Sequence, residues 1–483
     1  MMRNNKGFVL LLTFIFMTIL TVFTGALIYM TTADMKNAAS QSDDVNLGSL
    51  ADAGIDRAHR EIRDDYLTTT STGAADLRGA DTSLSVSLGS PGNMRYIDTS
   101  NAAINADTDQ AILRTFDSNY TNTRIMSVEI HVRAARAGAG TGATMQIDYT
   151  TDGSTYTIVI TQALTTTMTD YSATVAALAS WSTMMSSNFR LRAIRTAGDR
   201  NINIDAMYLR VNYGIDTLKE SWATGSYAVF PISLNGGTIQ SITITDEESK
   251  VHLNYASQPL LQDLLTNLGV ASAAAKATNI VNYRGALLTN PFDSVEELQQ
   301  VTGITASDYS AVKNYFTVYS FVNSNVYRPT GPRAPVNINT APFEVLKALF
   351  DSLGLEAGDS TSLANDIITF RNSTPFTCFY SSSSATDFYD FVNGISYLTA
   401  DERNIVLDNC DPSSLIPVSG YAGYNCTTTE LCYASGIFYA EALSQLGARK
   451  FRVKTLIGND GSHTFTTYTG DTTASGWRKE NFE

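Results

Sequence analysis

Apolar residues fill the start of the chain without interruption. From Phe8 to Met30 no residue is charged, and 23 helical residues at about 1.5 Å each reach about 35 Å, enough to cross the hydrocarbon core of a bilayer. Arg3 and Lys6 precede this run and Asp34 follows it. This distribution of charge predicts a cytoplasmic N-terminus and export of everything after about residue 35.

Two simpler interpretations of this run compete with the one developed below. A cleaved secretory signal has an apolar core of about 7 to 15 residues, so this run is too long for one. An uncleaved signal anchor would have the same flanking charges and stays an alternative.

A helical pattern continues beyond the apolar run. Between Ala33 and Tyr66, small and apolar residues recur at helical spacing among charged residues. They are Leu47, Leu50, Ala51, Gly54, Ile55, Ala58 and Ile62. We expect one long helix over residues 8–66, with its second half lying as a stalk on a folded body.

Strand-like alternation replaces the helical pattern after a linker rich in Thr, Ser, Gly and Ala (68–81). Residues 81–214 contain no lysine and no cysteine. Asp152–Gly153 lies between two alternating runs and predicts a hairpin, and a change of parity near Ala206 predicts a bulge. About eight strands in this segment predict an inserted antiparallel β-sandwich of jelly-roll type. Such a module is either a spacer between other parts of the protein or a domain that binds a sugar or a protein.

The chain then repeats itself. Val251-His-Leu-Asn-Tyr-Ala256 returns 85 residues later as Val336-Asn-Ile-Asn-Thr-Ala341. Later pairs are Arg284 and Arg371, Pro291-Phe292 and Pro375-Phe376, and the capping-box starts Thr305 to Asp308 and Thr399 to Glu402. We expect two homologous helical units, residues 249–335 and 336–432. Thr340 is expected to cap the second unit's first helix, and both arginines to be buried partners of helix C-termini.

The segments on either side of the repeat alternate like strands. They are Ser226–Thr245, Gly436–Leu443, Phe451–Ile457, Thr464–Tyr468 and Gly476–Glu480. We expect residues 215–248 and 433–483 to form one sheet on the stalk helix, with the helical units inserted between its strands. The predicted fold class is therefore α+β: a long N-terminal helix with an antiparallel sheet, an inserted sandwich and an inserted duplicated helical lobe.

The junction Lys6-Gly7-Phe8-Val9-Leu10-Leu11-Leu12-Thr13 resembles that of type IV prepilins. The resemblance implies a leader of residues 1–7, cleavage by prepilin peptidase between Gly7 and Phe8, and methylation of Phe8. Most of that family has Glu as the fifth mature residue, where this chain has Leu12. A subunit without that carboxylate resembles the minor pseudopilin K of type II secretion, whose paired helix-hairpin-helix-like units the repeat also resembles.

This resemblance covers residues 1–66 and about 215–483, and it leaves the sandwich outside. It implies a subunit at the tip of a pseudopilus that starts assembly and contributes to protein export. The implied partners are I-, J- and H-like minor pseudopilins and the inner-membrane secretion platform. The chain would be a single-pass inner-membrane protein with most of its residues in the periplasm.

Two other readings stay open, an adhesin-like tip of a type IV pilus and a membrane-anchored DNA-uptake receptor. Charge argues against nucleic acid as a partner: the whole chain carries a net charge of −14, and residues 250–420 hold nine Lys or Arg against sixteen Asp or Glu. Such a surface repels phosphates.

Four late cysteines and a group of carboxylates are the remaining candidate sites. In an exported chain the cysteines predict two disulfides, for which we favour Cys426 with Cys432 and Cys378 with Cys410. The resemblance implies a possible calcium site, and Asp401, Glu402, Asp408 and Asp411 cluster near the cysteines. We favour a capped helix and solvated charge as the explanation of these four residues.

Catalytic motifs are missing from the sequence. The histidines, at 59, 131, 252 and 463, fall in separate predicted elements. No phosphate loop or triad pattern accompanies them, and an activated nucleophile needs a base and an orienting group. We therefore expect a protein that is not an enzyme. Calcium is the one cofactor that we consider, and no other is expected.

Overall fold

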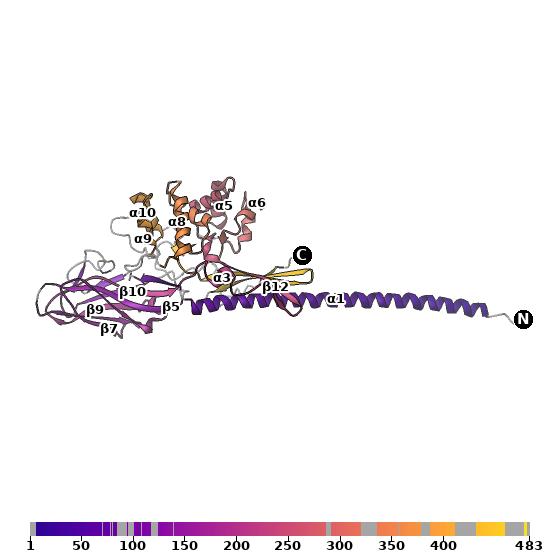
Figure 1. Ribbon diagram of the computed structural model, residues 1–483, viewed down its shortest axis with the longest axis horizontal. Helices are drawn as coiled ribbons and strands as arrows, with labels where there is room; N and C mark the ends of the chain where they lie inside the picture. The colour runs from indigo at the N-terminus through magenta and orange to yellow at the C-terminus, as the bar shows by residue number, and fades with distance from the viewer. Residues whose placement is uncertain are drawn as a thin grey trace.

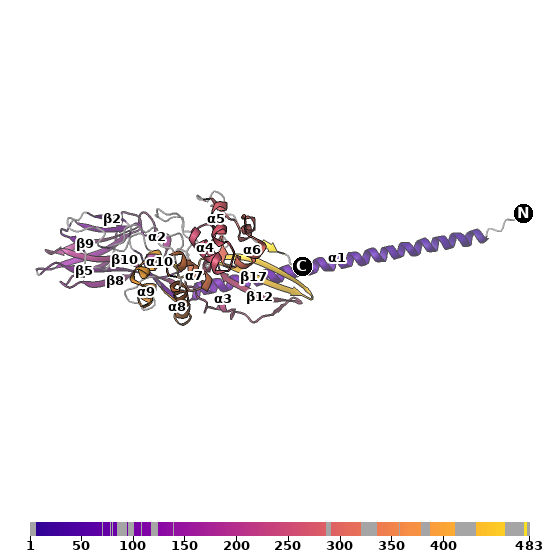
Figure 2. The ribbon, with the colours of Figure 1, turned by 90° about the horizontal axis from the view of Figure 1, so that it is seen from above.

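The computed structural model describes residues 6–69, 71–77, 79, 81–84, 94, 101–107, 109–116, 124–138, 140–285, 291–319, 336–356, 358–377, 387–410, 431–458 and 478–480. The fold is α+β, with one long helix, three larger antiparallel sheets and a helical lobe. Figures 1 and 2 show the helix running out of the folded body toward the N-terminus.

Helix α1 (Lys6–Thr68) is a single helix of 63 residues, which confirms the predicted continuous stalk. From Phe8 to Asn46 none of its side chains is buried, whereas all seven residues of the predicted apolar stripe are buried. Its first part is apolar and long enough to cross a membrane. In the part of the chain that the structure describes, the side chains of the apolar run (8–30) are exposed, whereas the inner half of the helix packs on the body.

The inner half of α1 lies on a five-stranded antiparallel sheet. Its order is β11 (Ile232–Leu234), β12 (Gly237–Asp246), β17 (Ile437–Leu446), β18 (Arg449–Gly458) and β19 (Arg478–Glu480). Small residues allow close contact: a Cβ added to Gly54 would lie 2.7 Å from the Cβ of Ala442. This sheet joins strands from both sides of the repeat, as predicted, although the predicted strand Thr464–Tyr468 lies outside the described residues.

The predicted sandwich consists of two five-stranded antiparallel sheets. One holds β1 (Thr72–Leu77), β3 (Ala102–Ile104), β5 (Ile125–Arg136), β8 (Thr169–Thr174) and β10 (Ile202–Gly214). The other holds β2 (Asp81–Leu84), β4 (Gln110–Arg114), β6 (Ala143–Thr150), β7 (Thr157–Ala163) and β9 (Arg190–Gly198). The predicted hairpin joins β6 to β7, and the predicted bulge is a register shift between Ile204 and Ala206.

The predicted linker was partly wrong. Residues Thr72–Leu77 form β1, which pairs with β10 from Thr72↔Gly214 to Leu77↔Leu209. The sequence Thr-Gly-Ala-Ala-Asp-Leu has little β propensity of its own, so this strand depends on its partner strand. The stalk helix consequently enters the sandwich with only a few residues between them.

The helical lobe contains the two predicted units. The first runs through β13 (Val251–His252), α4 (Gln258–Asn267), α5 (Ala273–Arg284), η4 (Val295–Gln300), α6 (Ala306–Val312) and β14 (Phe316–Thr317). The second runs through β15 (Val336–Asn337), α7 (Phe343–Ser352), α8 (Asp359–Ser373), α9 (Phe388–Asn393), α10 (Ala400–Cys410) and β16 (Leu431–Cys432). In each unit a short parallel strand pair joins the beginning to the end.

Both predicted capping boxes are present, at Thr305 with Asp308 and at Thr399 with Glu402. The predicted cap at Thr340 was wrong, because the residue before α7 is Pro342. Thr340 is buried, and its hydroxyl donates to Asp246 at the end of β12. Its side chain therefore ties the lobe to the sheet.

Candidate functional site

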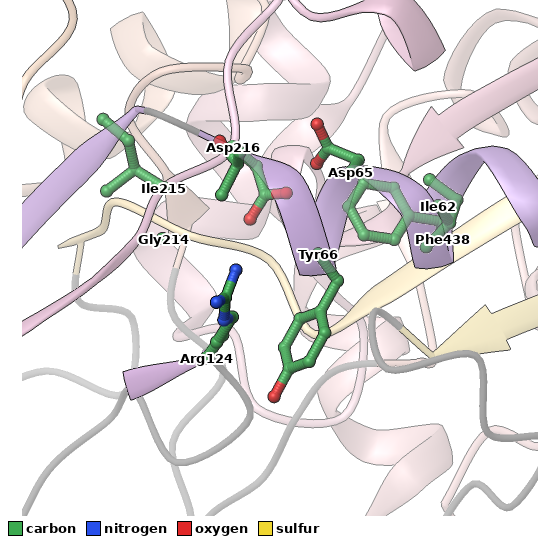
Figure 3. Close-up of a pocket in the computed structure, with 9 residues that line it drawn as sticks. Ile62, Asp65, Tyr66, Arg124, Gly214, Ile215, Asp216 and Phe438 are labelled. Carbon is green, nitrogen blue, oxygen red and sulfur yellow. The ribbon is translucent and has the colours of Figure 1, made fainter. Parts of the chain in front are cut away.

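The candidate site is a group of acidic side chains where α1 ends and the sandwich begins. The chain crosses into the sandwich after Thr69 and returns from β10 at Gly214, and Ile215 N donates to Ser71 O at 3.1 Å. Both crossings therefore meet beside the last turns of the helix. Figure 3 shows Asp65 of the helix and Asp216 of the returning segment around a common cavity.

Three carboxylates converge at this junction. Oxygen atoms of Asp65, Asp216 and Glu220 all lie within 4.8 Å of one another. Burial, together with the negative charges of Glu220 and Glu61, raises the pKa of Asp65 to about 8. Burial also raises the pKa of Asp216 well above its usual value, and so do Glu220 and Asp65. Because of these raised pKa values, the three carboxyl groups share protons among them near neutral pH.

Hydrogen bonds fix the positions of two of these carboxylates. Ser435 N donates to Asp216 at 2.6 Å. Glu220 accepts from Thr217 N at 2.8 Å and from the indole nitrogen of Trp222 at 3.0 Å. Burial raises the pKa of Glu220 even though these donors lower it.

Three more acidic residues are buried between this cluster and the helical lobe. Asp246, Glu247 and Glu248 lie around the 3-10 helix η3 (Glu247–Ser249), and each is 3% exposed. Asp246 accepts from Asn337 and Thr340 of the second unit, and Glu247 accepts from Thr317 of the first. Burial raises the pKa of Asp246 to about 6. This acidic segment therefore connects the sheet to both helical units.

A small cavity separates the cluster from the sandwich. It holds about 10 Å³, room for about one water molecule, and its lining includes Asp65, Tyr66, Arg124 and Asp216. Arg124 precedes β5 and donates to Leu67 O at the end of α1. A cation of the sandwich thus faces the same cavity as two carboxylates of the body. The three carboxylates alone do not define a metal site, and we assign none.

The two arginines of the repeat are buried, as predicted, but they bind other groups than expected. Arg284 donates to Leu253 O and Ala256 O, and Arg371 donates to Ile338 O. These carbonyls belong to the turns that precede α4 and α7, and not to helix C-termini. Burial lowers the pKa of each arginine to about 10. Both guanidinium groups hold the lobe together and do not face outward.

The hairpin tip of the first unit, residues 301–305, contains no Lys or Arg to meet phosphates. It contains Gly303, with a φ of 87°. The nearby Lys276 is paired with Asp308 at 2.7 Å, and Asn279 donates to Thr302 O at 2.7 Å. The neighbouring Glu296 and Glu297 add negative charge.

The other predicted site residues are only partly within the described chain. Cys410 and Cys432 are buried, whereas Cys378 and Cys426 lie outside the described residues, so both predicted disulfides stay predictions. Of the calcium candidates, Asp401, Glu402 and Asp408 lie on α10, and Asp411 is outside the described residues. Glu402 accepts from Thr399 in the capping box and from Glu356 N. The predicted cleavage site at Gly7 and Phe8 lies in the first turns of α1.

Comparisons with known proteins agree with parts of this architecture. The model of a helix-hairpin-helix motif family matches residues 246–317, which span the first helical unit. No curated protein matches the chain.

Among solved structures, the GspK–GspI–GspJ complex of the type 2 secretion system of enterotoxigenic Escherichia coli is similar at 15% identity. It covers 50% of this chain and 81% of that chain with a TM-score of 0.31. The CBM22-1 xylan-binding domain of Paenibacillus barcinonensis Xyn10C is 13% identical. That match covers 30% of this chain and 87% of that chain, with a TM-score of 0.19. CBM32-1 of a Clostridium perfringens family 31 glycoside hydrolase is 10% identical. That match covers 27% of this chain and 95% of that chain, with a TM-score of 0.19.

Proposed function

We propose that this protein is a minor pilin-type subunit of a type II secretion pseudopilus, of the K-like kind found at the filament tip. The observation that carries the proposal is the division of α1 into an apolar run whose described side chains are exposed and a half packed on an antiparallel sheet. A helix that is apolar on all sides needs lipid or other helices around it. A subunit that moves from the membrane into a filament would have lipid around this helix first and the helices of other subunits afterwards.

The shape of the body supports a terminal position. In Figures 1 and 2 the sandwich lies beyond the C-terminal end of α1, and the helical lobe stands to one side of the sheet. The next subunit of a filament would need the space that the sandwich fills. Leu12, where most prepilins have Glu, supports the same position because a subunit at the tip has no other N-terminus ahead of it to neutralise.

The proposed role is associative and not catalytic. Before processing, the chain would cross the inner membrane once with its N-terminus in the cytoplasm. Prepilin peptidase would cleave it, and the mature subunit would assemble with I-, J- and H-like partners on the secretion platform. The negative charge of the lobe and the pairing of Lys276 with Asp308 speak against a DNA-uptake role.

The processing step gives the sharpest first test. In cells with active prepilin peptidase, mass spectrometry of the membrane-extracted protein should find a chain that begins at methylated Phe8. A Gly7→Trp variant should keep residues 1–7. If the unchanged chain also keeps its first seven residues, the pilin-type assignment is wrong.

A further inference from the structure

The second helical unit supports one edge of the sandwich. Ala74 N in the edge strand β1 donates to Thr377 O at 3.0 Å. The two backbones approach closely, because a Cβ added to Gly73 would lie 2.4 Å from Thr377 O. Lys219 adds a cation to the same segment, since its Nζ donates to Ser373 O at 2.9 Å. The backbone that follows α8 therefore binds an edge strand that has a small residue at the contact.

The first unit holds the equivalent backbone in the same way. Phe292 and Phe376 correspond in the repeat, so the residues after them, Asp293 and Thr377, are counterparts. A buried asparagine bonds to the N–H and C=O of each phenylalanine. A ring of the preceding helix also packs on each one, with centroids 4.8 Å apart in the first unit and 4.7 Å apart in the second. The counterpart of Ser373 lies outside the described residues, so the comparison concerns the contact at Thr377 alone.

The contact that Thr377 makes is not repeated at Asp293. Asp293 is exposed, and its N–H donates to the carboxylate of Glu297 at 3.2 Å. Its C=O corresponds to the acceptor for β1, but it accepts no hydrogen bond from the residues that the structure describes. The lobe thus has two equivalent backbone surfaces, and the described part of the chain occupies the one in the second unit. We call the other, Pro291–Asp293 with Glu296 and Glu297, the first-unit surface.

Charge and position indicate what fits the first-unit surface. Asp293 and Glu296 are exposed and Glu297 is half-buried, so the surface is acidic and favours a strand with Lys or Arg beside the contact. In Figures 1 and 2, α5 and α6 of the first unit lie on the side of the lobe nearer the outer half of α1, whereas α8, α9 and α10 lie nearer the sandwich. In a filament, the subunit behind the tip would lie along that outer half.

We propose that the first-unit surface binds an edge β-strand from the sheet of the neighbouring pilin-type subunit. This inference rests on the proposed function and adds a place of contact to it. An N–H of the strand would donate to Asp293 O as Ala74 N donates to Thr377 O. A small residue would allow the close approach, and a basic side chain would lie beside Glu296. Edge strands suit this role because one side of their backbone is unpaired.

Site-specific photocrosslinking in cells that assemble the filament tests this proposal. Benzoylphenylalanine in place of Asp293 should crosslink to a pilin-type subunit, and mass spectrometry should place the crosslink in an edge strand of that subunit's sheet. The same probe at Asn365, an exposed position on α8 of the second unit, is the matched control and should not give this crosslink.

A charge reversal tests the chemistry of the contact. With the probe at Gln299, an exposed position on η4, Asp293→Lys should lower the crosslink yield about threefold, because an attraction between exposed charges is replaced by repulsion. Asn365→Lys adds positive charge elsewhere on the lobe and should leave the yield unchanged. A yield that Asp293→Lys does not lower would overturn the proposal, since the contact pairs an acidic surface with a basic strand.

The processing test separates a failure of this proposal from a failure of the proposed function. Where the chain begins at methylated Phe8 and is present in purified filaments, the lack of a crosslink from Asp293 would overturn this inference alone. A crosslink to a second copy of this chain, to an exported protein or to nucleic acid would overturn it as well. So would an equal crosslink from Asn365, because the contact would then not be specific to the first-unit surface.

Discussion

Asn254 and Phe292 are joined by two hydrogen bonds that close the first helical unit. The side-chain amide of Asn254 donates to Phe292 O at 2.9 Å, and its carbonyl oxygen accepts from Phe292 N at 2.8 Å. Asn339 and Phe376 repeat the arrangement in the second unit, with both distances at 2.9 Å. All four residues are buried. The duplicated sequence thus preserves a pair of hydrogen bonds as well as a hydrophobic pattern.

Removing this amide should open the first unit. An Asn254→Ala variant leaves the buried N–H and C=O of Phe292 without their partners, at a cost of about 1–3 kcal/mol for each group. Hydrogen exchange of the full-length protein in detergent should show faster exchange in α4 and α5. Asn365→Ala is the control, because that exposed amide bonds only within its own helix, to Thr361 O. Unchanged exchange in Asn254→Ala would contradict a structural role for the amide.

The repeat also supplies a test of acid sensitivity. In the first unit Asn254 N donates to the ring of His252 at 3.1 Å, and in the second Asn339 N donates to Asn337 at 3.0 Å. Burial lowers the pKa of His252 to about 3. Below its ordinary value of 6.5 the unfolded chain binds a proton that the folded chain does not. The free energy of unfolding should therefore fall as the pH drops from about 6.5 to about 3, by at most about 1.4 kcal/mol per pH unit.

A His252→Asn variant should keep the hydrogen bond and remove this acid sensitivity. Hydrogen exchange of α4 and α5 between pH 4 and 7, after correction for intrinsic rates, would measure the change. Helices α7 and α8 of the same molecule serve as the internal control, because their unit already has Asn337. Equal acid sensitivity before and after the substitution would show that another group is responsible.

Much of this architecture was predictable because its signals are local or duplicated. The apolar stripe of α1, the hairpin at Asp152–Gly153 and both capping boxes follow from neighbours in the sequence. The helical units were found because one pattern occurs twice. In contrast, β1 has weak propensity and owes its strand to β10, and Thr340 is recruited by Asp246, a residue 94 positions away.

The carboxylate cluster was missed because its members are far apart in the sequence. Asp65 precedes the inserted sandwich, whereas Asp216 and Glu220 follow it. A signal was nevertheless available, since residues on either side of an insertion must lie close together in the folded body. Burial and the resulting pKa shifts could not be predicted from that signal, because they depend on how closely the segments around β16 and η3 pack.

Packing of the stalk on the sheet should depend on one glycine. A Cβ at Gly54 would lie 2.7 Å from Ala442 Cβ and 3.4 Å from Ile239 Cγ2, so Gly54→Ala should push the helix off the sheet. We expect a loss of about 1–3 kcal/mol from overpacking, offset in part by the better helix propensity of alanine. Thermal unfolding of the full-length protein in detergent would measure it.

The matched control for that substitution is Gly48→Ala in the same helix. A Cβ at Gly48 meets nothing within 4 Å, so this variant should be neutral or more stable by up to about 1 kcal/mol. If both variants behave alike, close contact at Gly54 is not what holds the helix to the sheet.

The proposed position at the tip leads to a test at Leu12. This side chain is 56% exposed on the apolar half of α1, and a carboxylate placed there in lipid costs about 2.5–3.5 kcal/mol unless it finds a cation. A shaft subunit would find one in the N-terminal amine of the subunit ahead, whereas a tip subunit would not. We therefore expect Leu12→Glu to lower the yield of assembled protein as much as Leu11→Glu does, because neither carboxylate gains a partner. Quantitative mass spectrometry of purified filaments would give the number of copies relative to the major subunit. A rise in copies per filament for Leu12→Glu alone would place the protein in the shaft and contradict the tip assignment.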